Sequence, residues 1–267
     1  MRAILLSLFI AFLIAASFVF LIAAPVQAIT PCWKAIQTME DGKGFKECAR
    51  LYEEDGDSRA ALYLSGIALL RGDEESAMTW LKVAVIPTKQ YPDGYRYAQY
   101  KMGKIVLYGR YDMEIDTTVA YNLFHSAADQ GSVPAYYEYA RMLERGIGYR
   151  ASDIAEATDH YSTLLKHEDF EPARLRLEGL CGGTDSAYEL AEYYLIGDAT
   201  SIDLPEKDLE ESFLFFLIAS HLDHEDGEKR ANDLSEQLTY EQLSAAEEHF
   251  FLWQAADFSK MKCYVKS

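Results

Sequence analysis

The segment AYYEYARMLERGIGYR, residues 135–150, repeats a pattern that occurs 37 residues earlier in AQYKMGKIVLYGRYD, residues 98–112. In both segments tyrosine stands two residues after the first alanine, a small residue stands at offset five, and glycine stands at offset eleven. Further copies begin at Ala61 and Ser186, and a weaker copy begins at Ala173. Such self-similarity is typical of proteins built from stacked repeats.

Each repeated position of the pattern has a physical reason. Offsets four, five and eight share one face of a helix, where small and apolar side chains pack against a neighbour. Glycine at offset eleven can end the helix in the left-handed conformation, and a later aspartate can cap the next helix. The glycines are Gly72, Gly109, Gly146 and Gly197, and the aspartates are Asp73, Asp116, Asp153 and Asp208. The copies therefore predict helix-turn-helix units that bury their apolar faces by stacking into an all-α solenoid.

These residues resemble the Sel1-like repeat, a relative of the tetratricopeptide repeat, including the motif S-A-A-D-Q-G at 126–131. The resemblance covers 98–134 and 135–172 best, then 61–85, and 173–220 more loosely. The segment 238–254 is similar to the helix that often closes such bacterial proteins. The resemblance implies a right-handed α-solenoid of roughly five helical pairs that binds a protein partner on its concave face.

The N-terminus predicts export. Residues 1–28 have one basic residue, a long apolar run and a small-residue cleavage motif, which indicates a signal peptide removed after Ala28. The alternative is an uncleaved membrane anchor, because the apolar run 4–24 is long enough to span a bilayer. The predicted parts of the remaining chain are an N-terminal helical hairpin cap (29–58), the repeat solenoid (59–232), and a C-terminal capping helix with a tail (233–267).

Four cysteines in an exported chain predict two disulfides. Cys32 and Cys48 lie almost symmetrically about the turn 41–44, so an antiparallel hairpin of helices 31–39 and 45–54 would bring them together. Cys181 and Cys263 then pair by exclusion. The other two pairings stay open at this point, as do free buried thiols.

The charge of the chain restricts its partners. The formal net charge is −18, and removal of residues 1–28 leaves 24 basic against 43 acidic residues, or about −19. Such a chain repels phosphate backbones and anionic membrane surfaces, so nucleic-acid binding is not expected. A basic protein partner fits this charge best.

No catalytic motif is present in the sequence, and we predict no enzyme activity, catalytic residue, metal or cofactor. His221 and His224 have the spacing of a metal pair, but no third ligand is placed, and a solvated helix end is the simpler interpretation. Some cysteine-rich Sel1-like proteins bind or slowly hydrolyse β-lactams, which is the enzyme alternative. Their cysteines recur in each repeat, whereas the four cysteines here do not.

Tyrosines are the candidate partner-binding residues. Tyr63, Tyr100 and Tyr137 occupy the same offset in successive repeats, and Tyr136 and Tyr139 add to the third copy. Tyrosine offers a large contact area with a polar tip, as interface anchors do. Packing between repeats makes the same demand, so both interpretations stay open. We therefore predict an exported interaction scaffold of the cell envelope or medium, with an envelope regulatory or assembly factor anchored to the inner membrane as the alternative.

Overall fold

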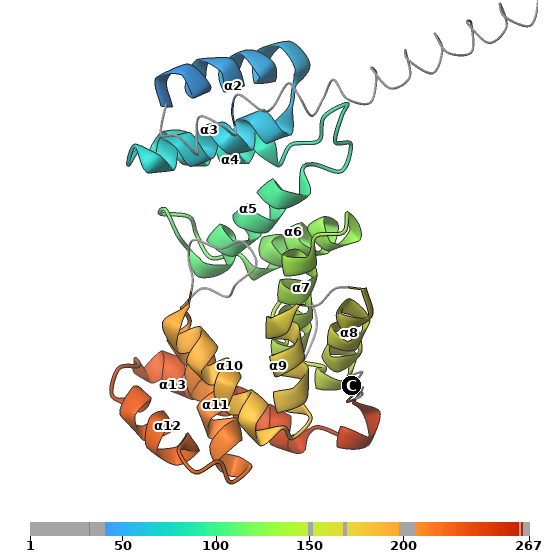
Figure 1. Ribbon diagram of the computed structural model, residues 1–267, viewed down its shortest axis with the longest axis vertical. Coiled ribbons are helices and arrows are strands. Elements are labelled where there is room, and N and C mark those ends of the chain that lie inside the picture. The colour runs from blue at the N-terminus through green and yellow to red at the C-terminus, as the bar shows by residue number, and fades with distance from the viewer. Residues whose placement is uncertain are drawn as a thin grey trace, which may run out of the picture. The chain divides into compact units, whose positions relative to one another are not determined.

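The computed structural model describes residues 32, 41–148, 152–167, 170–197, 207–261 and 263. Within these residues the chain forms twelve α-helices, one short 3₁₀ helix and no strand (Figure 1). The predicted signal segment 1–28 and the predicted helix 31–39, apart from Cys32, lie outside the described residues. Across the described ranges, no helix is long and apolar enough to cross a membrane. The chain divides into two compact units, residues 1–102 and 103–267, which are described separately.

The first unit is built on three successive helices, followed by the first half of α5 (Arg96–Tyr108). These are α2 (Asp41–Asp55), α3 (Ser58–Leu70) and α4 (Glu74–Ala84), with α3 packed against both α2 and α4 (Figure 1). The core between α2 and α3 contains Cys48, Leu51, Leu64 and Ile67, together with Cys32. Helix α2 begins at Asp41, so the predicted turn at 41–44 is helical instead, because nothing in DGKG stops the helix that follows.

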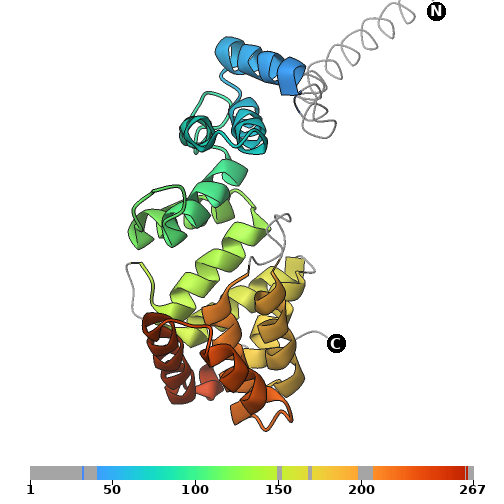
Figure 2. The same cartoon turned by 90° about the vertical axis from the view of Figure 1, so that its left-hand side faces the viewer.

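The second unit contains the other half of α5 and eight further helices. These are α6 (Thr117–Asp129), α7 (Val133–Arg145), α8 (Ile154–His167), α9 (Glu171–Leu180), α10 (Thr184–Ile196), α11 (Leu209–His221), α12 (Gly227–Ser235) and α13 (Tyr240–Ala255). Each helix from α6 to α11 packs against the next one in the chain, with α11 close to α10 in both views (Figures 1 and 2). This serial packing is the all-α solenoid of helical repeats that the sequence predicts.

The predicted helix starts and stops are confirmed. The carboxylates of all four repeated aspartates accept hydrogen bonds from backbone amides in the first turn of α4, α6, α8 and α11. Gly146 ends α7 with a left-handed φ of 66°. Gly103 is needed for close approach, because a Cβ there would lie 2.6 Å from a ring carbon of Phe124 on α6. The small residue at offset five therefore sets the distance between paired helices.

The weaker copy at Ala173 differs from a full repeat. It forms α9, but Gly183 caps α10 directly, so no second helix of its own follows α9. The double glycine at 182–183 shortens the connection, and α10 then pairs with α11 as the next repeat does. Helix α9 is consequently an additional helix between two repeats.

The predicted closing helix is present as α13, capped by Thr239 and Gln242 in a reciprocal capping box. It lies across several earlier helices. His249 reaches Glu144 on α7, and the indole of Trp253 donates a 2.9 Å hydrogen bond to the carbonyl of Leu180 on α9. The rings of Phe250 and Trp253 also contact His221 on α11. Because α13 covers this side of the second unit, Glu144 in the last turn of α7 and Leu180 at the end of α9 are buried.

Candidate functional site

A buried network of charged side chains lies at the centre of the second unit. Glu138, Arg141 and Glu144 are three residues apart on α7, so they project from one face of the helix, and all three are buried. Burial of unpaired charges is very costly, so such side chains require partners on neighbouring helices. The repeat pattern gives no indication of these partners, which come from α5, α9 and α11.

Arg176 on α9 is the hub of this network. Its side chain has no exposed area, and it holds both carboxylate oxygens of Glu144, at 2.7 Å from Nε and 2.9 Å from Nη2. Nη2 also contacts Glu211 on α11 at 2.8 Å, and Nη1 donates to the hydroxyl of Tyr194 on α10 at 3.1 Å. One guanidinium thereby joins α7, α9, α10 and α11.

Arg141 extends the network toward α5. Its Nη1 donates to Glu138 at 2.9 Å, and the other oxygen of Glu138 accepts from Lys104 Nζ at 2.9 Å. Nη2 of Arg141 lies 2.9 Å from Glu211. Burial by itself would raise the pKa of Glu211, but Arg141, Arg176 and Arg145 outweigh it and hold that pKa well below its ordinary value. Glu211 therefore remains ionised inside the protein.

His249 of α13 completes the network from the C-terminal side. Its ring is buried, and Nε2 lies 3.4 Å from a carboxylate oxygen of Glu144. Within the described part of the chain, neither ring nitrogen makes a hydrogen bond. Burial lowers the pKa of His249 to about 4. The acids Glu144 and Glu211 raise this pKa, whereas Arg145 and Arg176 lower it further. The imidazole is therefore neutral at pH 7.

A pocket of about 300 Å³ opens beside this network. Its walls come from α5, α6, α7, α11, α13 and the turn after α7. The lining residues are Leu107, Tyr108, Thr117, Glu138, Arg141, Met142, Arg145, Ile147, Asp208, Glu210 and Gln242. Five of them have acidic or basic side chains, so the pocket presents charges of both signs at close range.

A second pocket, of about 330 Å³, lies over α6, α7 and α8 and is mostly apolar. Tyr136 lines it, together with Ala128, Gly131, Ser132, Val133, Thr163 and Leu164. The hydroxyl of Tyr136 makes a 2.8 Å hydrogen bond with Nδ1 of His160, and the two rings meet edge to face. We call this site the Tyr136 pocket.

The predicted partner-binding tyrosines fall into two groups. Tyr137 is 2% exposed, and its hydroxyl lies 2.7 Å from that of Tyr194, while Tyr100 and Tyr139 are also buried. Tyr63 and Tyr136 are half-buried and keep part of their ring at the surface. The shared offset therefore does not produce an exposed row of rings. The ring of Tyr137 packs against Tyr161 and Phe170, and the ring of Tyr139 packs against Tyr121 and His160, so both fill space between adjacent helices.

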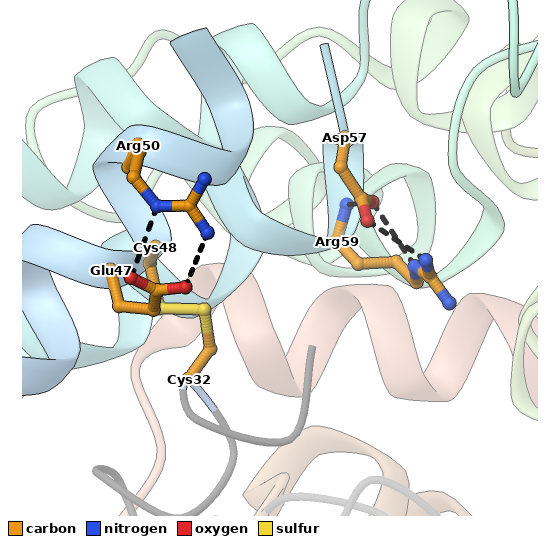
Figure 3. The surroundings of a disulfide bond; sticks show 6 residues. All are labelled: Cys32, Glu47, Cys48, Arg50, Asp57 and Arg59. Atoms are coloured by element: carbon orange, nitrogen blue, oxygen red, sulfur yellow. Dashed lines mark hydrogen bonds and ion pairs between the residues drawn. A yellow bond between two sulfur atoms is a disulfide. The ribbon is translucent and has the colours of Figure 1, made fainter. Parts of the chain in front are cut away.

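Both predicted cysteine pairs lie at disulfide distance. The sulfurs of Cys32 and Cys48 are 2.10 Å apart, near the ion pair of Glu47 and Arg50 on α2 (Figure 3). The sulfurs of Cys181 and Cys263 are 2.00 Å apart. The second pair ties the end of the chain to the residue that follows α9.

The histidine pair does not form a shared site. His224 stacks on Tyr188, with ring centroids 4.0 Å apart, whereas His221 contacts the rings of Phe250 and Trp253. Among the described residues, no group of three His, Cys, Asp or Glu side chains is arranged to hold a metal ion.

Sequence reasoning missed the charged network. One signal was available in YYEYARMLER, where Glu138, Arg141, Glu144 and Arg145 keep helical spacing on a helix whose other faces are also apolar or aromatic. A helix with buried residues all round has no solvated face for such charges. Arg176 carries no comparable local signal.

Comparisons with known proteins agree with this architecture. The sequence profile of the Sel1 repeat matches residues 58–85, 96–132, 133–163 and 184–224, which together make up just over half of the chain. A search of curated proteins gave no significant match.

The solved structures similar to this chain include three crystal structures. A Sel1 repeat protein from Oxalobacter formigenes is 28% identical, with a TM-score of 0.41, over 48% of this chain and 93% of its own. A protective antigen of uropathogenic Escherichia coli with an SLR fold is 18% identical, with a TM-score of 0.41, over 80% of this chain and 48% of its own. A structure from Klebsiella pneumoniae subsp. pneumoniae, described as a sel1 repeat protein, is 19% identical, with a TM-score of 0.39, over 68% and 95%.

Sel1 repeat proteins generally mediate protein–protein interactions and are typically non-catalytic scaffolds. The four profile matches coincide with the helical pairs α3–α4, α5–α6, α7–α8 and α10–α11. The chain therefore belongs to the Sel1 repeat family.

Proposed function

We propose that this protein is an exported scaffold that binds a protein partner at the Tyr136 pocket. The observation that carries this proposal is a half-buried tyrosine that lines a mostly apolar pocket of about 330 Å³. Pockets of this size and character are typical of binding sites. Of the described tyrosines in the third repeat, Tyr136 is the one that combines partial exposure with a pocket.

The Tyr136 ring is held in place before any partner arrives. His160 fixes its hydroxyl at 2.8 Å, and Tyr139 packs between His160 and His125 at centroid distances of 5.4 and 5.1 Å. A preorganised aromatic side chain loses little conformational entropy on binding, which favours its use as an interface anchor.

Export and the character of the partner are part of the same proposal. The apolar segment and small-residue motif within 1–28, together with two cysteine pairs at disulfide distance, support an oxidising compartment. The net charge of −18 supports a basic partner whose association slows as salt increases. Intact mass of the exported protein tests this part directly, because retention of residues 1–28 would instead favour the anchored envelope factor.

The binding site is tested with a photocrosslinking amino acid at position 136. Tyr240 on α13 is the matched control, since it is a tyrosine that is 81% exposed and lies outside the pocket. We expect a protein adduct in cells of the native organism from position 136 and none from position 240. Equal adducts at both positions, or none at 136 under conditions where the chain is folded and exported, would refute the Tyr136 pocket as the interface.

A further inference from the structure

The charged pocket beside α7 has features that packing alone does not explain. It is formed by residues of α5, α6, α7, α11 and α13, and its rim includes Asp208 and Glu210 at the start of α11. The side chains of these two acids are 17% and 21% exposed, so a ligand in the pocket can reach them. Deeper in the pocket lie the buried side chains of Glu138 and Arg141.

Among the described residues, the charges in and beneath this pocket do not balance. The acids are Glu138, Glu144, Asp208, Glu210 and Glu211, and the bases are Lys104, Arg141, Arg145 and Arg176. Glu210 is paired with Arg145, while Asp208 lies no closer than 3.6 Å to Arg141. Within this described set one negative charge is in excess, and Asp208 and Glu210 are the partly exposed acids of the pocket.

Two further observations indicate a ligand with both a cation and an oxygen acceptor. Burial raises the pKa of Glu210, and the nearby charges of Glu211 and Asp208 raise it further, while Arg145 lowers it. A cation beside Glu210 would therefore stabilise its ionised form. Arg141 lines the pocket with its side chain only 4% exposed, and its Nε has no hydrogen-bond partner within the described residues. A buried donor without a partner costs stability, and a carbonyl oxygen that reached it would recover that cost.

We infer that this pocket receives an arginine side chain of the protein partner. The guanidinium is held by Asp208 and Glu210, and a carbonyl of the same peptide accepts a hydrogen bond from Nε of Arg141. A planar guanidinium suits two neighbouring carboxylates better than the point charge of lysine does. The inference rests on the proposed function, because it presumes a protein partner, but it concerns a different site from the Tyr136 pocket.

The probe is a blocked tripeptide, acetyl-Gly-Arg-Gly-amide, titrated into the mature full-length chain at low ionic strength and followed by backbone amide chemical shifts. The same peptide with citrulline in place of arginine keeps the shape and removes the charge. We expect shifts in the amides of 107–108, 141–147 and 208–211, and about tenfold weaker binding of the citrulline peptide. Equal binding of the two peptides, or shifts confined to other surfaces, would overturn the inference.

Two variants test the carboxylates separately. Glu210→Gln and Asp208→Asn each remove one negative charge, and asparagine preserves the cap of α11 because it is also a favoured N-cap residue. Each should weaken binding of the arginine peptide by about tenfold. Glu225→Gln is the control, since it removes the same charge from an exposed position outside the pocket. If Glu225→Gln weakens binding as much as Glu210→Gln does, the attraction is diffuse and no arginine site exists. Loss of this site with retained crosslinking at position 136 leaves the proposed function standing.

Discussion

Arg176 and Glu144 form a bidentate ion pair in which neither side chain has any exposed area, with contacts of 2.7 and 2.9 Å between α9 and α7. The pair connects the extra helix α9 to the third repeat. Glu211 and Tyr194 accept further hydrogen bonds from the same guanidinium, so its partners come from three other helices, α7, α10 and α11.

Removal of Arg176 should be strongly destabilising. Arg176→Ala would leave Glu144 buried without its arginine and would remove one of the three arginines around Glu211, and breaking a buried ion pair costs about 3–5 kcal/mol of unfolding free energy. Arg174→Ala is the control on the same helix, because Arg174 forms exposed pairs with Glu171 and Glu178 that are worth about 0–1 kcal/mol. Urea unfolding of both variants, followed by circular dichroism, measures the difference. Similar losses for the two arginines would contradict the network as described.

Stability should fall as pH is lowered from about 6.5 to about 4 because of His249. Its pKa is 6.5 when unfolded and about 4 when folded, so the unfolded chain binds more protons in this range. The stabilisation is complete above pH 6.5, and about 3 kcal/mol is lost by the time the pH falls through the folded pKa. In His249→Gln, the urea midpoint should change less with pH across this range than it does in the unmodified chain. A parallel pH dependence in that variant would show that other groups cause the effect.

The carboxylates that titrate nearby act differently. Glu211 and Glu138 have lowered pKa values, so their contribution is present above pH 4.5 and is lost only as the pH falls below it. Glu210 has a raised pKa and acts in the opposite direction to His249. The difference between the unmodified chain and His249→Gln therefore isolates the imidazole, because both proteins keep Glu210.

The cysteine pair 181–263 should stabilise the chain more than the pair 32–48. The two pairs close loops of 82 and 16 residues, and loop-closure entropy predicts contributions of about 4.5 and about 3 kcal/mol, respectively. Denaturation of Cys181→Ser and Cys48→Ser variants tests this order. Non-reducing peptide mapping of the exported protein should identify both pairs, and alkylation of all four thiols without a reductant would show that neither bond forms.

Replacement of Gly103 by alanine should destabilise the protein. The added Cβ would lie 2.6 Å from the Phe124 ring, and overpacking of this kind costs about 1–3 kcal/mol. Gly42→Ala in α2 is the control, because no atom lies within 4 Å of its added Cβ, and alanine favours a helix by up to about 1 kcal/mol. The two substitutions should therefore change the thermal midpoint in opposite directions. A neutral Gly103→Ala would mean that α5 and α6 can separate slightly without loss.

The fold was predictable because its determinants are local. Gly146 and the aspartate caps act within one turn of helix, and small residues such as Ala140 act between adjacent helices of one repeat. The charged network was not predictable, because Arg176 meets Glu144 and Glu211 across 32 and 35 residues of sequence. The orientation of the tyrosines was equally hidden, since partner contact and helix packing select the same side chain at the same offset.

Helix α13 also has an evolutionary consequence. Recombination between similar repeats can add or remove a helical pair, and an open array tolerates this because each unit contacts only its neighbours. Here Trp253 contacts Leu180 on α9, and His249 contacts Glu144 on α7. If a helical pair were inserted between α7 and α9, helix α13 could no longer make both contacts. The C-terminal helix thus opposes insertion of a further helical pair between α7 and α9, because one of these two contacts would be lost.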